Sequence, residues 1–235
     1  MIMSTIAHNL QAVDARIRAA ASAAGRDRAA VQLLAVSKTF GPDAVLEAIA
    51  AGQTAFGENY LQEALDKMAA VGAALPGREI AWHFIGPIQS NKTRAIAAGF
   101  DWVHTVDRLK IAQRLSEQRP QDCGPLNICL QINISGEASK SGAAPAELPE
   151  LARLVAQLPR LRLRGLMAIP EPETDVARQR AAFARLRALA EALRADGVEL
   201  DTLSMGMSAD MGAAIAEGAT IVRVGSAIFG ARPYD

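Results

Sequence analysis

Lys38 is the side chain of this sequence that is best suited to attack a carbonyl group. It follows the apolar run Val31–Ser37, which predicts a buried strand, and it is one of only five lysines in the chain. Lys38 continues the alternation of Leu34 and Val36, so it faces the same side as two apolar side chains. Partial desolvation lowers the pKa of an amine and favours its neutral, nucleophilic form. A lysine that only extends from the strand end into water would give the same pattern.

Two segments near the C-terminus have the composition of a phosphate site. They follow two predicted strands and each turns into a helix: Leu203–Asp210 and Val222–Gly230. Backbone N–H groups at helix starts attract anions, Ser208 and Ser226 add hydroxyl donors, and Gly225 permits close approach of a ligand to the backbone. A simple helix cap explains Ser208 equally well.

Polar residues also stand within or after other apolar strands. Arg223 lies between Val222 and Val224, and a buried guanidinium is costly unless a carboxylate or a ligand partners it. Asn59 is either a polar group at the mouth of a site or a helix N-cap. A lone His83 between aromatic neighbours is typical of a satisfied structural histidine.

Other sequence patterns exclude several kinds of site. The segment Ser135–Gly142 superficially resembles a nucleotide phosphate loop, but it lacks the glycine directly before Lys140, so we reject that function and expect a flexible loop near the mouth. No His-Glu-x-x-His spacing and no Ser-His-Asp order is present, and Cys123 and Cys129 fit no zinc pattern. We therefore expect no metal.

Strand and helix patterns alternate along the chain and predict eight βα units after an additional N-terminal helix. Such units pair their strands in parallel, and eight of them in about 250 residues or fewer are typical of a closed TIM-type (β/α)8 barrel, here one domain over residues 1–235. An open doubly wound sheet is the alternative. The expected strands are Val31–Ser37, Thr54–Gly57, Ala81–Ile85, Asp101–Thr105, Asn127–Ile132, Arg162–Met167, Asp201–Ser204 and Thr220–Val224. The expected helices are Ser4–Ala24, one from Pro42 to just before Gly52, Tyr60–Ala74, Asn91–Ala98, Asp107–Gln118, Ala146–Leu158, Thr174–Ala195 and Ala209–Glu217.

The composition limits the class of protein. Lys plus Arg and Asp plus Glu number 25 each, so the zero net charge gives no long-range attraction for nucleic acid. The N-terminus has no basic segment followed by an apolar run, and no apolar stretch approaches the roughly 20 residues of a membrane helix. These features predict a cytosolic, cytoplasmic protein without a signal peptide or a membrane span.

A set of long motifs in a fixed order extends over nearly the whole chain. The motifs are Leu34–Thr39, Phe56–Glu63, Trp82–Lys92, Asn133–Gly142, Arg164–Pro170, Leu203–Met211 and Arg223–Arg232. Together they resemble the small proteins of the pyridoxal 5′-phosphate (PLP) homeostasis family, which are relatives of the N-terminal barrel domain of alanine racemase. Several long motifs that match together are far more specific than any one of them.

This resemblance implies PLP as the cofactor and a role for each candidate residue. It implies that Lys38 forms a Schiff base with PLP, that Arg223 lies at the pyridine nitrogen and that Asn59 lies beside the ring. It assigns the phosphate, in part through backbone N–H groups, to Met207, Ser208, Gly225 and Ser226. The family commonly has threonine where this chain has Ser226, which keeps the hydroxyl.

The resemblance implies a PLP-binding protein that maintains the cofactor pool and amino-acid balance without turnover. An arginine in place of a carboxylate at the pyridine nitrogen leaves that nitrogen unprotonated and weakens PLP as an electron sink. Racemases of this fold complete their site with a second domain that supplies a tyrosine base. This chain ends at Asp235 after the eighth unit, and its tyrosines are Tyr60 and Tyr234.

Two alternatives remain open. One is a PLP-dependent racemase or lyase that acts on a small amino acid, and the other is a phosphate-binding barrel enzyme with an aldolase-like Lys38 and no PLP. In the favoured interpretation no residue is catalytic, the protein is a monomer, and PLP-dependent apoenzymes are the expected recipients of the cofactor.

Overall fold

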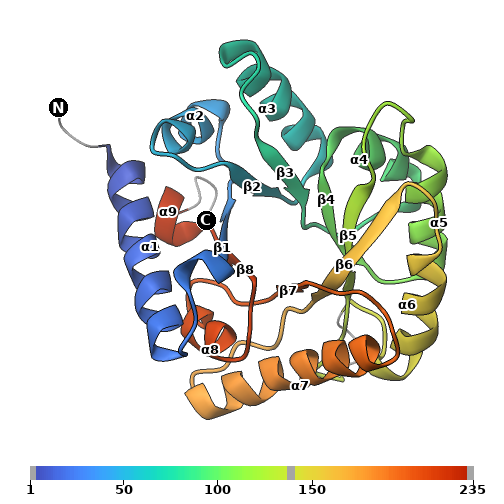
Figure 1. The fold of residues 1–235 in the computed structure, drawn as a ribbon. Coiled ribbons are helices and arrows are strands. Elements are labelled where there is room, and N and C mark those ends of the chain that lie inside the picture. Colours follow the sequence, from blue (N-terminus) through green and yellow to red (C-terminus); the bar gives the residue numbers. More distant parts are fainter. Residues whose placement is uncertain (1–3, 137–140, 232–235) are drawn as a thin grey trace.

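Eight parallel strands close into a barrel in the computed structural model, which describes residues 4–136 and 141–231 (Figure 1). Each strand pairs with the next along the chain, and β8 pairs with β1. This confirms the predicted (β/α)8 barrel and excludes the open sheet. The strands are β1 (Gln32–Val36), β2 (Ala55–Glu58), β3 (Ala81–Phe84), β4 (Trp102–Val106), β5 (Leu126–Gln131), β6 (Leu161–Met167), β7 (Thr202–Ser204) and β8 (Ile221–Val224).

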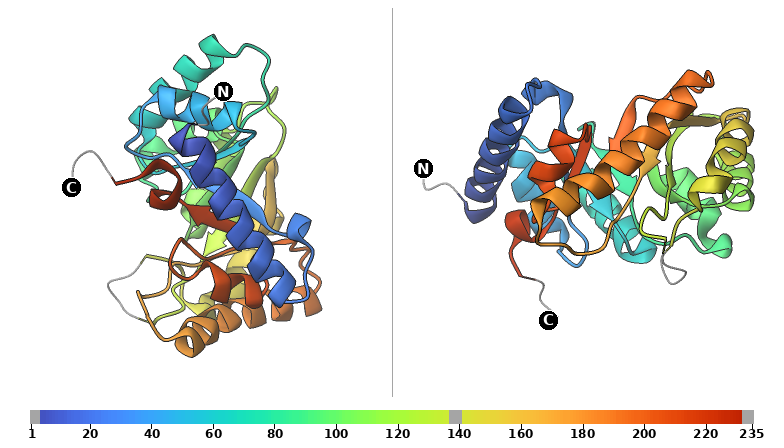
Figure 2. Two further views of the ribbon diagram at one scale, coloured as in Figure 1. Left: turned by 90° about the vertical axis from the view of Figure 1, so that its left-hand side faces the viewer. Right: turned by 90° about the horizontal axis from the view of Figure 1, so that it is seen from below.

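Helices cover the outside of the barrel (Figures 1 and 2). They are α1 (Thr5–Ala23), α2 (Pro42–Ala50), α3 (Leu61–Ala74), α4 (Thr93–Gly99), α5 (Leu109–Gln118), α6 (Leu148–Ala156), α7 (Val176–Ala195), α8 (Met211–Ala216) and α9 (Ser226–Phe229). Their order agrees with the prediction, and the bounds shift where a 3-10 turn precedes a helix, at Ser90–Lys92 and Pro145–Glu147. Of the loop predicted at Ser135–Gly142, residues 137–140 lie outside the described part of the chain.

The N-terminal helix α1 anchors the two loops that follow β7 and β8. Its apolar stripe packs beside α2, α8 and α9 (Figure 2). The side-chain amide of Asn9 donates to the carbonyl oxygen of Ile228 (2.9 Å). The guanidinium of Arg16 donates to the carbonyl oxygen of Ser208 (2.7 Å). The side chains of α1 that are buried are Leu10, Val13, Ile17 and Ala21, at the predicted helical spacing.

The strands are largely apolar because helices cover their outer face while side chains fill the barrel interior. β2 and β8 are buried along their whole length, and β1 is buried after its first residue. Polar groups inside such a barrel need hydrogen-bond partners. The structure contains two clusters of buried polar side chains that are partners of one another. One cluster lies beside the end of β1, and the other lies within the barrel.

The cluster beside β1 consists of three charged side chains. Lys67, on α3, is 3% exposed, and its ammonium lies 2.6 Å from Glu58 Oε1 and 3.0 Å from Glu63 Oε1. It also donates to the carbonyl of Ser37 (2.8 Å), whose hydroxyl donates to Glu58 Oε1 (2.6 Å). Burial raises the pKa of the Glu58 carboxyl, and the Lys67 ammonium opposes that rise. The cluster therefore fixes the backbone directly before Lys38.

Thr39, directly after Lys38, adopts a backbone conformation that is rare for a β-branched residue. Its φ of 69° lies in the left-handed region. Such a conformation costs about 1–3 kcal/mol and persists only where the surroundings enforce it. The backbone N–H of Thr39 donates to Glu63 Oε1 (2.7 Å), the oxygen that also accepts from Lys67. One ion cluster thus holds both residues that flank Lys38.

Replacing Lys67 by methionine should destabilise the fold by about 3–5 kcal/mol, because it leaves Glu58 as an uncompensated buried charge. The double variant Lys67→Met/Glu58→Gln should lose clearly less free energy of unfolding than the single variant. Denaturant unfolding followed by circular dichroism measures both losses. Lys110→Met, at an exposed position of α5, is the matched control and should stay within about 0.5 kcal/mol of the parent protein.

The loss in the Lys67→Met variant should shrink as the pH falls through the pKa of Glu58. Burial raises this pKa above its unfolded value, and loss of the opposing Lys67 ammonium raises it further, so the folded variant gains more stability than the parent as the pH falls. Equal losses for the single and double variants at all pH values would contradict the ion-pair explanation.

Candidate functional site

One cavity at the carboxyl ends of the strands brings together all of the predicted site residues. Its volume is about 300 Å³, at the lower end of the range of ligand pockets. Val36, Phe40, Ile85 and Ile169 form an apolar part of its wall. The predicted residues that line it are Lys38, Asn59, Met207, Ser208, Arg223, Gly225 and Ser226.

The pairing of β1 with β8 brings Lys38 beside residues from the other end of the sequence. The register sets Ala35 opposite Val224, so the chain leaves both strands at the same side of the cavity. Lys38 therefore lines the cavity together with Gly225. Lys38 is partly buried, as its apolar neighbours in the strand predict.

Asn59 lies in the cavity wall and is not the helix cap that the sequence left open. The N-cap residue of α3 is Tyr60, and Oδ1 of Asn59 is buried without a hydrogen-bond partner. Gly86 makes this arrangement possible, because a Cβ at Gly86 would lie 2.2 Å from the carbonyl oxygen of Asn59. A buried, unpaired acceptor beside a cavity fits a ligand that carries a hydrogen-bond donor.

The loop between β7 and α8 supplies Met207 and Ser208. It begins at Gly206, whose φ of 94° favours glycine. Ser208 does not cap α8, because the N-cap residue of that helix is Asp210. The backbone N–H of Met207 is engaged within the loop, since it donates to Asp210 Oδ1 (2.6 Å). Met207 lines the cavity, and its side chain is half-exposed. Ser226, at the start of α9, adds its hydroxyl to that of Ser208.

Arg223 reaches the cavity from inside the barrel. It is 4% exposed, and its guanidinium donates to Ser204 Oγ (2.9 Å) and to the carbonyl oxygen of Ala168 (3.1 Å). Both acceptors are neutral, so no carboxylate among the described residues forms an ion pair with it. Burial lowers the pKa of Arg223 to about 10, which leaves it protonated at neutral pH. A buried cation of this kind favours an electron-rich ligand atom in the cavity.

Behind Arg223 a chain of hydrogen bonds continues through the barrel interior. Ser204 Oγ lies 2.8 Å from Nδ1 of His104, and Nε2 of His104 lies 2.9 Å from Nδ1 of His83. Burial lowers the pKa of His83 to about 3 and that of His104 well below its usual value, so both rings are neutral. His83 also stacks on Trp102, with ring centroids 5.3 Å apart. The sequence predicted a structural histidine whose ring nitrogens are both hydrogen-bonded. In the structure Nδ1 of His83 has a partner and Nε2 has none.

The residues behind the cavity wall escaped the sequence analysis. Ser204 and His104 are polar residues at buried positions of barrel strands, and a polar side chain two residues away from an apolar one that faces the same side is the signal that could have identified His104. Lys67 was missed because lysines on helices are normally exposed. Its spacing of four residues after Glu63 was the available indication of an ion pair.

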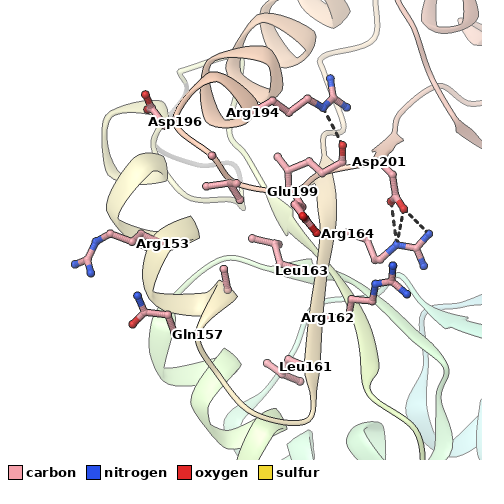
Figure 3. Close-up of a pocket in the computed structure, with 14 residues that line it drawn as sticks. Arg153, Gln157, Leu161, Arg162, Leu163, Arg164, Arg194, Asp196, Glu199 and Asp201 are labelled. Carbon is pink, nitrogen blue, oxygen red and sulfur yellow. Dashed lines mark hydrogen bonds and ion pairs between the residues drawn. The ribbon is translucent and has the colours of Figure 1, made fainter.

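A larger groove, of about 890 Å³, lies at the amino ends of β6 and β7 (Figure 3). Three of its charged side chains already have partners: Arg164 lies 2.8 Å from Asp201, and Arg194 donates to the carbonyl oxygen of Leu200. Barrels of this type bind substrates at the carboxyl ends of their strands. The smaller cavity is therefore the candidate site.

The described part of the chain offers no metal cluster, and its buried thiol is not reactive. Residues 4–136 and 141–231 contain no group of three or more His, Cys, Asp or Glu that could hold a metal ion. Cys123 and Cys129 form no disulfide, and burial raises the pKa of Cys129 to about 12. Among the same residues, no helix is both long and apolar enough to cross a membrane.

Comparison with known proteins finds relatives that align with this chain over nearly its whole length. The model of the alanine racemase N-terminal domain matches residues 8–233. A pyridoxal phosphate homeostasis protein of Pseudomonas aeruginosa is 68% identical over 232 residues, which cover 99% of this chain and 98% of that protein. The pyridoxal phosphate homeostasis protein of Escherichia coli K12 is 55% identical over 233 residues, which cover 99% of both chains.

Solved structures share the fold. PipY of Synechococcus elongatus, solved with PLP bound, has 38% sequence identity and a TM-score of 0.81 over 96% of this chain and 100% of PipY. Alanine racemase of Corynebacterium glutamicum, at 22% identity and a TM-score of 0.67, aligns with 98% of this chain over 62% of its own length and is similar in fold alone. From these matches, the chain belongs to the family of pyridoxal phosphate homeostasis proteins, which have the fold of the alanine racemase N-terminal domain.

Proposed function

We propose that this protein binds PLP as a Schiff base to Lys38 and maintains the PLP pool and amino-acid balance without turnover of its own. The observation that carries the proposal is the single cavity that gathers the amine of Lys38, two serine hydroxyls and the guanidinium of Arg223. The relatives named as PLP homeostasis proteins and the PLP-bound PipY support the same cofactor. Bound PLP would supply an aldehyde that condenses with an amine and a pyridine ring that withdraws electrons.

Lys38 provides the amine of the covalent link, and its condensation with an aldehyde releases one water molecule. Val36, Phe40 and Ile85 share the cavity wall with it, and an apolar wall favours the neutral amine. The charged cluster around Lys67 fixes the backbone on both sides of Lys38. The backbone that carries Lys38 is therefore already in place when the bond forms.

The phosphate is assigned to the ends of β7 and β8, where barrels of this type commonly bind phosphate. The hydroxyls of Ser208 and Ser226 are suitable donors to a charged oxygen, and Gly225 leaves room beside them. Met207 is assigned to the same phosphate site, which it lines beside the two serines, and its backbone N–H donates to Asp210 Oδ1.

Arg223 is assigned to the pyridine nitrogen and Asn59 to the edge of the ring. A guanidinium only donates hydrogen bonds, so Arg223 would leave the ring nitrogen unprotonated. That weakens the electron withdrawal needed to remove an α-proton from an amino acid. The unpaired Oδ1 of Asn59 offers an acceptor to a hydroxyl group of the ring.

We further propose that the protein acts in the cytosol as a monomer and passes PLP to PLP-dependent apoenzymes. Two of the residues that line the cavity, Ile169 and Met207, are 43% and 40% exposed. Exposed apolar side chains at the mouth of a cavity are suited to contact with another protein. A recipient could thus approach the site directly.

Borohydride reduction of the purified protein should fix PLP to the peptide that contains Lys38, and mass spectrometry identifies that peptide. Lys38→Ala should abolish the covalent link while the unfolding temperature stays close to that of the parent, because the side chain lies in a cavity wall. Lys92→Ala, at an exposed position, is the control and should keep the adduct. An adduct on another lysine would show that the assignment is wrong.

The double variant Ser208→Ala/Ser226→Ala should bind PLP at least about tenfold more weakly, because each hydroxyl contributes about 1.5–3 kcal/mol to a charged group. Binding of pyridoxal, which lacks the phosphate, should change much less. Equilibrium titrations measure both affinities, with Ser22→Ala at an exposed position of α1 as the control. Equal losses for the two ligands would remove the phosphate role.

The PLP-loaded protein should exchange the α-proton of L-alanine slowly or not at all in deuterated water, because Arg223 does not protonate the ring. Mass spectrometry and chiral chromatography follow deuterium uptake and racemisation. The same preparation should transfer PLP to a PLP-dependent apoenzyme. Rapid exchange or racemisation that requires Lys38 would falsify the carrier function and favour a racemase or lyase.

A further inference from the structure

The hydrogen-bond chain behind Arg223 is unusual for the interior of a barrel, which is normally filled by branched apolar side chains. It leads from the cavity through Ser204 and His104 to His83, and the last three residues are fully buried. Groups of this kind need a consistent set of donors and acceptors, because an unsatisfied buried polar atom costs about 1–3 kcal/mol.

One order of protons leaves fewer groups unsatisfied in this chain than the reverse order does. A guanidinium cannot accept, so Ser204 Oγ accepts from Arg223 and its own hydrogen goes to Nδ1 of His104. The neutral ring of His104 then carries its proton on Nε2 and donates it to Nδ1 of His83. The only group left without a partner is Nε2–H of His83.

The opposite order is less favourable. If His104 donated to Ser204, the hydroxyl hydrogen of Ser204 would have no acceptor among its contacts. Nε2 of His83 would then be an unpaired acceptor as well. Two buried groups would be unsatisfied instead of one, so the donor-only character of Arg223 sets the direction of the whole chain.

We propose, on the basis of the function proposed above, that Ser204 and His104 are positioning residues that aim the guanidinium of Arg223 at the ring nitrogen of PLP. Nδ1 of His104 accepts the hydrogen bond of the Ser204 hydroxyl, which leaves the oxygen of Ser204 as a fixed acceptor for Arg223. The carbonyl of Ala168 holds a second guanidinium nitrogen. Both contacts restrict the rotation of the guanidinium about its side chain.

The two groups that accept hydrogen bonds from Arg223 are both uncharged. Lys67, the other buried cation described above, is compensated by two carboxylates, whereas Arg223 is held by a hydroxyl and a carbonyl. A carboxylate at the position of His104 would offset the charge that acts on the cavity. The neutral chain fixes Arg223 without a bonded carboxylate, so its positive charge, which the more distant Asp210 offsets in part, still acts on the ligand.

The order of protons can be measured directly, because the chain has only three histidines, His8, His83 and His104. Long-range ¹H–¹⁵N correlation spectra of the protein with and without PLP should show both buried rings with a protonated Nε2 and a bare Nδ1. The exposed ring of His8 gives the reference signal of a solvated imidazole. A protonated Nδ1 on His104 would overturn the proposal.

The effect on the cofactor is tested with PLP and its carbocyclic analogue, in which the ring nitrogen is replaced by CH. His104→Leu should weaken PLP binding by about tenfold and leave the analogue nearly unchanged, because only PLP uses the hydrogen bond from Arg223. Ser204→Ala should act in the same way and serves if His104→Leu does not fold. His8→Leu is the matched control. Equal losses of affinity for PLP and for the analogue would show that His104 and Ser204 have only a structural role, and they would overturn the proposal.

Arg223→Leu separates this proposal from the function on which it rests. If Arg223→Leu weakens both ligands equally, the assignment of Arg223 to the ring nitrogen fails. If Arg223→Leu discriminates between the ligands but His104→Leu does not, the assignment stands and the positioning role fails.

Discussion

The pairing of β8 with β1 is the constraint on which the rest of this structure depends. It closes the barrel and brings Lys38 and Gly225, from opposite ends of the sequence, to one cavity. The helix α1 packs along the same seam and binds the loops after β7 and β8 through Arg16 and Asn9. Stability and site geometry therefore share one set of long-range contacts, and a change that loosens the seam would disturb both.

Two buried cations are stabilised in opposite ways. Lys67 lies outside the barrel against two carboxylates, and this compensated cluster holds the strained backbone around Lys38. Arg223 lies inside the barrel against neutral acceptors, so its charge is available to a ligand. A charge acts strongly in an interior of low dielectric constant, so the guanidinium of Arg223, which lines the cavity, acts on a ligand bound there.

The fold alone does not distinguish a PLP carrier from a PLP enzyme. The alanine racemase of Corynebacterium glutamicum shares the barrel at 22% identity, whereas the relatives at 55% and 68% identity are PLP homeostasis proteins. Function is decided by the groups that surround the ring and by the bases that can reach a substrate. In the function that we propose for this chain the decisive group is Arg223, because a donor-only side chain at the ring nitrogen would disfavour the removal of α-protons.

The amino-acid sequence by itself determined the order of the elements and the closed barrel, and it singled out candidate residues for the cavity wall. Apolar periodicity is a local property, and parallel strands end together at one side of a barrel, so residues such as Lys38 and Arg223 were predictable. Only the tertiary structure decided that Asn59 and Ser208 are cavity residues and not helix caps. It also revealed the contacts of Lys67 and of His104, because partners 9 and 100 residues away meet only after the strands and helices pack, and no local pattern specifies them.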